Sequence, residues 1–385
     1  MFLSSKLPQL RPNIFSYISG LAAQHKAINL AQGFPDFGCS PLLVELLHKY
    51  SAKGMNQYAP GQGIPALRKQ ISAYLQRRDG YGYDPDTEIT ISTGATEALF
   101  CSFAALIHPG DEVIILEPAY DTYEPTVALF GGVIKRVTLS APHFTVDWDA
   151  VRHALSPKTK AIVLNSPHNP SGTILSQADL EQLGQLLDGT QVVVISDEVY
   201  ADMVFSPQRH ISVSRIASLQ DRSIVIGSFG KSFHITGWKT GFFAAPQALS
   251  EELRKIHSLT TFSVHTPSQF ALAELMENPQ HIDEVAAMYE QKKKYFLDGL
   301  IDSAWQFLPS QGSYFLTADY QQLSLDDDMS FCHTLIEKYG VATIPYSAFY
   351  LNAPAEQRLL RFCFAKKEQT LDQAIEILRR VPTLS

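Results

Sequence analysis

Five short apolar segments, separated by longer connections, constrain the fold of this chain more than any other feature of its sequence. They are residues 89–92, 113–116, 161–164, 192–195 and 224–226. Each is a continuous apolar run, which is typical of strands in a parallel sheet that is covered on both faces. The connections between them have helical or irregular patterns. We therefore predict an α/β fold with a mostly parallel sheet covered by helices.

The chain is longer than one hydrophobic core usually supports. It has 385 residues, 45% of them hydrophobic and 18% charged, which is an ordinary globular composition. Further strands are predicted at 313–317, 341–344 and 359–364, and further helices at 329–339 and 371–380. We expect an N-terminal arm (1–12), a large domain (46–280) and a smaller α+β domain formed by 13–45 and 281–385.

Charge and cysteine usage exclude several classes of protein. The net charge of −8, from 39 acidic and 31 basic residues, argues against nucleic acid as the main partner. The four cysteines form no C-x-x-C pair and have no histidine at ligand spacing, which predicts reduced, buried thiols and no metal site: Cys39, Cys101, Cys332 and Cys363. The sequence contains no signal-peptide core and no apolar run of membrane-spanning length, so we expect a cytoplasmic protein.

Two nucleotide-binding motifs match only formally. Residues 230–232 (GKS) resemble the end of a phosphate-binding P-loop, but two residues separate Gly227 from Gly230 where that loop needs four. Residues 61–66 fit the dinucleotide pattern G-x-G-x-x-A, but no apolar strand precedes Gly61. We reject both.

Distinctive polar residues follow each predicted strand. They lie in residues 93–97, 117–120, 165–170, 196–200 and the turn 227–232. Ligands of open parallel sheets bind beyond the carboxyl ends of the strands. We therefore expect these five loops to converge on one site.

Lys231, in the last of these loops, has two interpretations. It is either a solvated turn lysine or a lysine that forms an imine with an aldehyde cofactor such as pyridoxal phosphate (PLP). A bound PLP needs a phosphate site, which the backbone of Gly94, Ala95 and Thr96 would supply ahead of a helical run at 98–107, unless this is an ordinary helix start. Ser228 and Lys239 would add a hydroxyl and a charge to that site.

The cofactor ring has requirements of its own. Asp197, after a buried strand, suits the pyridine nitrogen, although it equally suits a helix N-cap. Tyr200, three residues on, would share a helical face with Asp197 and reach the phenolic oxygen. Asn169 would donate to the same oxygen or belong to a plain turn. Tyr120 would stack on the ring or be a core aromatic residue.

Arg361 is the candidate for the α-carboxylate of an amino acid, because its fork matches both oxygens. On a strand it shares a face with the small residues Cys363 and Ala365. The alternative is an ordinary surface arginine. Lys231, Asp197 and Arg361 together favour an amino acid site built around PLP.

Several of these segments resemble the class I and II (fold-type I) PLP-dependent aminotransferases. They are residues 165–172, 196–200, 228–241 and 361–364. A further set is similar to the branch of the kynurenine–oxoglutarate transaminases and bacterial methionine aminotransferases: residues 32–37, 56–59, 117–123 and 344–350. The resemblance covers nearly the whole chain.

The resemblance implies a role for each matching residue. Lys231 would be the Schiff-base lysine, Asp197 would contact the pyridine nitrogen, Tyr200 and Asn169 the phenolic oxygen, and Tyr120 would stack. The remaining cofactor residues would hold the phosphate: Ala95, Thr96, Ser228, Lys239 and, from the second subunit of a homodimer, Tyr58. Arg361, Asn169 and the backbone of Gly33 would hold the substrate carboxylate.

Two positions depart from the family pattern. Lys239 stands where many relatives have arginine, which replaces a bidentate phosphate grip by a point charge. Phe15 stands where the kynurenine enzymes have tryptophan, which changes the side-chain pocket.

We expect an aminotransferase that works by a ping-pong mechanism through pyridoxamine phosphate. The aromatic residues Phe15, Tyr58, Phe349 and Tyr350 predict an apolar pocket for methionine or aromatic amino acids, with kynurenine and glutamine as further candidates. Two alternatives stay open. One is a β-lyase acting on cysteine S-conjugates or cystathionine with the same residues. The other is a non-catalytic PLP-sensing protein, which needs an attached effector domain for which the sequence leaves no room.

Overall fold

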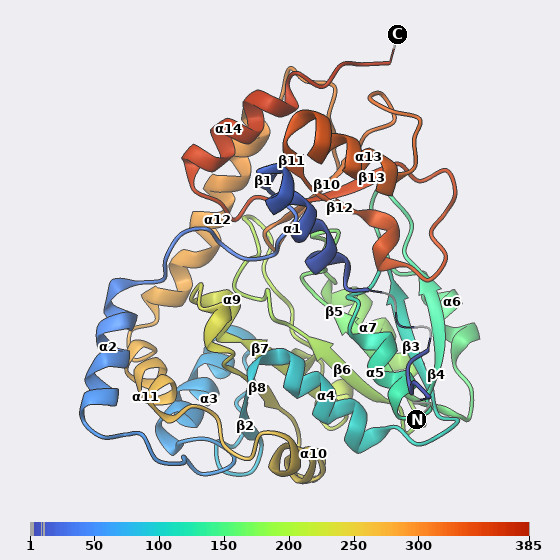
Figure 1. Cartoon of the computed structure of the whole chain (residues 1–385). Helices are drawn as coiled ribbons and strands as arrows, with labels where there is room; N and C mark the ends of the chain where they lie inside the picture. Colours follow the sequence, from blue (N-terminus) through green and yellow to red (C-terminus); the bar gives the residue numbers. More distant parts are fainter. Residues whose placement is uncertain (1–3, 9, 11, 385) are drawn as a thin grey trace.

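A seven-stranded sheet forms the centre of the computed structural model, which describes residues 4–8, 10 and 12–384 (Figure 1). Its order is β2-β8-β7-β6-β5-β3-β4. The strands are β2 (Ile89–Ser92), β3 (Glu112–Glu117), β4 (Val133–Thr138), β5 (Thr159–Asn165), β6 (Val193–Asp197), β7 (Ser223–Ser228) and β8 (Gly241–Ala244). The pairs from β7 to β4 are parallel, and β8 is antiparallel to both neighbours. The predicted fold class and all five predicted strands are confirmed.

Alternate residues of these strands enter two different cores, which explains the continuous apolar runs. On one face, Ile115, Val163 and Ile195 pack with α4 (Gly94–Leu106), α5 (Tyr123–Leu129) and α10 (Gln247–Thr260). On the other, Ile114, Ile162 and Val194 belong to the core of a second set of helices. This set comprises α2 (Pro41–Ala52), α3 (Pro65–Asp79), α6 (Trp148–Ala154), α7 (Gln177–Leu186), α8 (Ala217–Gln220) and α11 (Thr266–Leu275).

Two smaller sheets lie beside the central one, in the upper part of Figure 1. One is antiparallel, in the order β12 (Ile344–Pro345), β13 (Leu359–Cys363), β10 (Phe315–Asp319), β9 (Gln306–Phe307). The other pairs β1 (Ile28–Asn29) with β11 (Val341–Ala342) in parallel, which joins the beginning of the chain to its end. These two sheets share a core of their own, the third in the molecule. Its helices are α1 (Ile14–His25), α12 (Gln280–Asp298), α13 (Asp328–Thr334) and α14 (Glu368–Leu378).

Some predicted elements differ from those observed. The strand predicted at 341–344 is the two short strands β11 and β12, and the helix predicted at 329–339 ends in a π-helical turn, Leu335–Tyr339. All four cysteines are free, but Cys39 is only half-buried rather than buried. The predicted arm includes residues 1–3, 9 and 11, which lie outside the described residues. No helix in the described part of the chain is long and apolar enough to cross a membrane.

Candidate active site

Lys231 lies in a one-turn helix, α9 (Phe229–Ser232), directly after β7. Its Nζ donates hydrogen bonds to the hydroxyl of Tyr314 at 2.9 Å and to the carbonyl oxygen of Gly33 at 3.3 Å. Burial lowers the pKa of Lys231 to about 8. Because the amine is hydrogen-bonded to these two groups and its pKa is lowered, the interpretation as a solvated turn lysine is wrong.

Asp197 is buried at the carboxyl end of β6. Its Oδ2 accepts a hydrogen bond from the hydroxyl of Tyr123 at 2.6 Å, and burial raises its pKa to about 6. In the described part of the chain no lysine or arginine forms a salt bridge with it. A buried carboxylate that forms no salt bridge within the described residues suits a protonated ring nitrogen, because such a charge would offset the cost of burial.

No helix begins at Asp197. The chain turns after β6, so the N-cap interpretation is wrong, and Tyr200 does not share a helical face with Asp197. Tyr200 is buried in the turn instead. Its ring meets that of Tyr314 edge-on at 5.2 Å, and Lys231 Nζ lies 5.5 Å from its centroid.

Arg361 on β13 is not a surface residue, since only 1% of it is exposed. Nη1 donates to Oδ1 of Asn169 at 2.7 Å and Nη2 to the carbonyl of Ala31 at 2.8 Å. Its buried Nε has no partner among the described residues. A buried guanidinium with a free donor and no carboxylate partner is prepared to bind an anion.

Aromatic rings enclose this guanidinium. Its central carbon lies 3.9 Å from the ring centroid of Phe315 and 5.1 Å from those of Phe15 and Phe349. Tyr350, grouped with Phe15 and Phe349 in the sequence, packs against Tyr346. Aromatic rings therefore make up much of the surroundings of Arg361.

The N-terminus of α4 lies close to Lys239. Gly94 has φ +70°, and a β-carbon there would lie 3.6 Å from Lys239 Nζ. A β-carbon on Gly241 would lie 2.6 Å from the carbonyl oxygen of Gly227, so glycine is needed where β7, β8 and the start of α4 meet. The start of α4 and the side chain of Lys239 therefore lie side by side at the ends of β7 and β8.

The structure places the remaining predicted residues as follows. Ala95 and Thr96 form the first turn of α4, and Ser228 ends β7. The half-buried ring of Tyr120 meets that of Tyr123, the partner of Asp197, at 5.7 Å. Among the described residues of this chain, Tyr58 makes no hydrogen bond or ring contact with Lys231. It is 82% exposed, and its ring meets Phe262 edge-on.

The sequence interpretation missed Tyr123 and Tyr314. Tyr123 had a weak signal, because it follows Tyr120 by one helical turn after a predicted strand. Tyr314 had none, since an aromatic residue at the start of a predicted strand indicates core packing.

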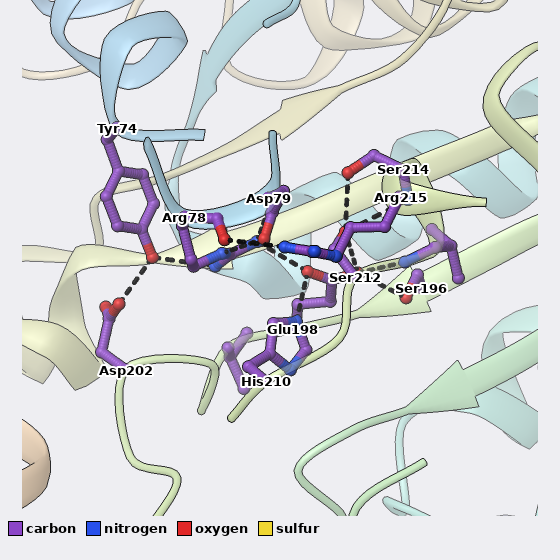
Figure 2. Close-up of polar contacts among 12 residues, drawn as sticks. Tyr74, Arg78, Asp79, Ser196, Glu198, Asp202, His210, Ser212, Ser214 and Arg215 are labelled. Carbon is purple, nitrogen blue, oxygen red and sulfur yellow. Dashed lines mark hydrogen bonds and ion pairs between the residues drawn. The ribbon is translucent and has the colours of Figure 1, made fainter. Parts of the chain in front are cut away.

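A network of hydrogen bonds and ion pairs centres on Arg78 and Glu198 (Figure 2). Arg78 of α3 pairs with the adjacent Asp79 at 2.7 Å and with Glu198, the neighbour of Asp197, at 2.8 Å. His210 also pairs with Glu198 at 2.8 Å. Burial would raise the pKa of Glu198, but His210 and Arg78 outweigh that effect and hold it below its ordinary value.

The same network reaches the lysine turn. The hydroxyl of Tyr74 accepts from Arg78 and donates to Asp202 at 2.6 Å, and Asp202 accepts from Ser232, the neighbour of Lys231, at 2.5 Å. Helix α3 is thereby linked to Glu198 and Ser232, which directly follow Asp197 and Lys231 in the sequence.

Comparison with known proteins decides the family. Residues 25–378 match the family described as Aminotransferase class I and II. The chain is a class I and II aminotransferase. It is 47% identical to the methionine aminotransferase of Escherichia coli, with 98% of both chains covered, and 36% identical to a probable N-succinyldiaminopimelate aminotransferase of Mycobacterium tuberculosis, with 97% of both covered. A kynurenine–oxoglutarate transaminase of Dictyostelium discoideum is 32% identical over 98% of this chain and 96% of its own length.

Solved structures agree with this aminotransferase assignment. The crystal structure of an Escherichia coli protein with a methionine aminotransferase function superposes with a TM-score of 0.97, at 47% identity, covering 99% of this chain and 100% of the other. The Thermus thermophilus aspartate aminotransferase with maleate gives 0.91 at 28% identity, covering 99% and 100%. The expected family and fold type are confirmed. Aminotransferases act on amino acids and 2-oxo acids, and members of this family generally depend on PLP.

Proposed function

We propose that this aminotransferase moves the amino group of methionine or an aromatic amino acid to a 2-oxo acid, in two half-reactions on PLP. The observation that carries the proposal is the arrangement of three groups around one site. Lys231 has a lowered pKa. Among the described residues, Asp197 has no salt bridge and the buried Nε of Arg361 has no hydrogen-bond partner. Each suits a different part of an amino acid bound to PLP.

The residues present fit the cofactor. When bound, PLP supplies an aldehyde that accepts the amino group and a ring that takes up the electron pair released at the substrate Cα. Lys231 would hold the aldehyde carbon, and Asp197, oriented by Tyr123, would hold the proton on the ring nitrogen. The start of α4, Ser228 and Lys239 would bind the phosphate, while Asn169 and Tyr200 would bind the phenolic oxygen and Tyr120 would stack on the ring.

Lys231 Nζ would carry the proton that leaves Cα. Only the neutral amine can accept it, and a pKa of about 8 makes the neutral form far more abundant at neutral pH than the ordinary value of 10.5 does. Burial thus prepares the general base that transamination needs.

Arg361 would bind the α-carboxylate through two parallel hydrogen bonds, with Asn169 and the backbone of Gly33 beside it. The rings of Phe15 and Phe349 next to the guanidinium favour an apolar substrate side chain. Similarity to the Escherichia coli methionine aminotransferase supports methionine as a donor.

We extend the proposal to the assembly. A homodimer would bring Tyr58 to the phosphate of the partner subunit, which its exposure in this chain permits. The division into a large domain (46–280), a small domain (13–45 and 281–385) and an arm (1–12), and a cytoplasmic location, are further parts of the proposal.

The visible absorption of the PLP-loaded protein tests the reaction. L-Methionine without an acceptor should convert the cofactor band stoichiometrically to that of the aminated cofactor, and a 2-oxo acid should restore it. Continuous release of 2-oxo acid and ammonia without an acceptor would instead indicate a β-lyase, and a band unaffected by methionine or aromatic amino acids would contradict the proposed substrate class.

A further inference from the structure

We propose that Tyr314 is a positioning residue of this site, whose hydroxyl accepts a hydrogen bond from Lys231 Nζ and fixes the amine in place during proton transfer. This inference rests on the proposed function, because it assigns Lys231 the role of proton carrier. It concerns a contact between two side chains of this chain that no sequence motif relates.

The positions of the hydrogens follow from the chemistry of the three groups. The hydroxyl oxygen of Tyr314 lies 2.5 Å from the carbonyl oxygen of Gly33 and 2.9 Å from Lys231 Nζ. A carbonyl can only accept, so the single hydroxyl proton points to Gly33. The lone pairs of the hydroxyl oxygen then face Lys231, which donates to it.

The hydroxyl cannot easily move. Tyr314 is fully buried just before β10, and its ring is enclosed by those of Tyr200 at 5.2 Å, Tyr289 at 5.6 Å and Phe315 at 4.8 Å. Burial also raises the pKa of Tyr314 well above its ordinary value, so the phenol stays neutral.

The acceptor on the other side is equally fixed. A β-carbon on Gly33 would lie 2.9 Å from the ring of Phe315, so this backbone packs directly on that ring. The carbonyl of Gly33 and the hydroxyl of Tyr314 therefore present two oxygens to Lys231 at set positions.

Two oxygen acceptors affect Lys231 in two ways. They stabilise the ammonium more than the neutral amine, and so oppose the effect of burial on its pKa. They also hold Nζ in one direction, and the rate of a proton transfer depends steeply on such alignment.

Tyr314→Phe removes the hydroxyl and keeps the ring, and Tyr289→Phe is the matched control. Tyr289 is also fully buried and touches the ring of Tyr314, but its hydroxyl has no partner among the described residues. Thermal unfolding of both variants would first establish that each is folded.

The first measurement uses cofactor-free protein. The rate at which an amine-directed acylating reagent modifies Lys231, followed by peptide mass spectrometry over a range of pH, gives the pKa of this amine. We expect Tyr314→Phe to lower the midpoint by about half a unit to one unit. We expect Tyr289→Phe to leave it unchanged.

The second measurement uses PLP-loaded protein and L-methionine. We expect kcat to fall about tenfold or more in Tyr314→Phe, with KM within about twofold of the wild type, because alignment rather than substrate binding is lost. A wild-type midpoint and kcat in Tyr314→Phe, or equal changes in Tyr289→Phe, would overturn the inference. If the wild-type protein does not transaminate, the proposed function is contradicted. A shifted midpoint in Tyr314→Phe would then still establish the contact between Tyr314 and Lys231.

Discussion

At the scale of single residues, burial shifts the pKa values of Asp197 and Lys231 in opposite directions. It lowers the pKa of Lys231 and raises that of Asp197, because in both cases it disfavours the charged form. The chain places both groups where their charges are costly. That cost is offset only when a bound molecule supplies complementary groups.

Asp197→Asn should therefore stabilise the cofactor-free protein. The folded-state pKa of Asp197, about 6, exceeds the ordinary 3.8, so folded protein keeps a proton that the unfolded chain has lost between these values. Stability consequently falls as pH rises from about 4 to about 6 and stays lower above that range. Urea unfolding should show a gain of about 1–3 kcal/mol for Asp197→Asn at pH 8, and none near pH 3.

The exposed Asp283 provides the control for this change. Asp283→Asn should alter the stability little at either pH, since it loses only a surface ion pair. A destabilised Asp197→Asn protein at pH 8 would show that the charged carboxylate is satisfied within the chain.

Arg361→Lys should weaken substrate binding while keeping the charge. Lysine lacks the fork that binds two carboxylate oxygens, so we expect the KM for methionine to rise about ten- to hundredfold. Arg254→Lys is the control, because Arg254 binds Thr90 and the carbonyl of Ile89 instead. An unchanged KM in Arg361→Lys would exclude Arg361 from carboxylate binding.

At the scale of elements, the network around Arg78 and Glu198 connects α3 to the end of β6 (Figure 2). Through Tyr74 and Asp202 it also reaches Ser232 of α9. Two adjacent arginines of α3 allow the contribution of this network to the free energy of unfolding to be measured. Arg78 pairs with the buried carboxylates of Asp79 and Glu198, whereas Arg77 pairs with Asp283 at the surface.

Arg78→Met should lower the free energy of unfolding by about 3–5 kcal/mol, because it removes the cation that pairs with the buried carboxylate of Asp79 and leaves Glu198 with His210 alone. Arg77→Met should change it by about 1 kcal/mol or less. Urea denaturation measures both. Equal effects would show that the network does not contribute as a buried set of charges.

The sequence predicted the elements that have a simple apolar pattern and missed those that do not. Five strands of the central sheet were found as continuous apolar runs. Strand β4 was missed because it carries Lys135 and Arg136 at the sheet edge, and β8 because its four residues follow a turn and begin with Gly241. A helix was wrongly expected after Asp197, where the chain turns instead. The sequence has no capping pattern at this point that would distinguish a helix start from a turn.

At the scale of the whole molecule, contacts between distant segments complete the site. The convergence of five loops was predictable, since parallel strands end at one edge. The contact of Lys231 with Gly33, 198 positions away, depends on how the smaller sheets pack on the central one, and no local pattern encodes that. Tyr314 was missed for the same reason.

If the proposed homodimer forms around Tyr58, substitutions on the surface near this residue should disrupt it. Leu259, at the end of α10, is 84% exposed, and it lies near Phe262, the ring partner of Tyr58. Exposed apolar side chains that lie together, as those of Tyr58 and Phe262 do, are typical of an interface. Wild-type protein should have about twice the chain mass of 42.8 kDa by light scattering, and Leu259→Asp should shift it towards the monomer and weaken PLP binding.

Leu325→Asp is the control for this change, because Leu325 is 77% exposed at a different place in the fold. It should leave the mass unchanged. A monomeric wild-type protein that binds PLP and transaminates would contradict the shared site.

The central claim is that Lys231 holds the cofactor, and borohydride trapping tests it most directly. The protein would be loaded with PLP, reduced, digested and mapped by mass spectrometry. We predict one stoichiometric PLP adduct, on Lys231, and its loss in Lys231→Ala. An adduct on another lysine, or unaltered trapping in Lys231→Ala, would contradict this role of Lys231.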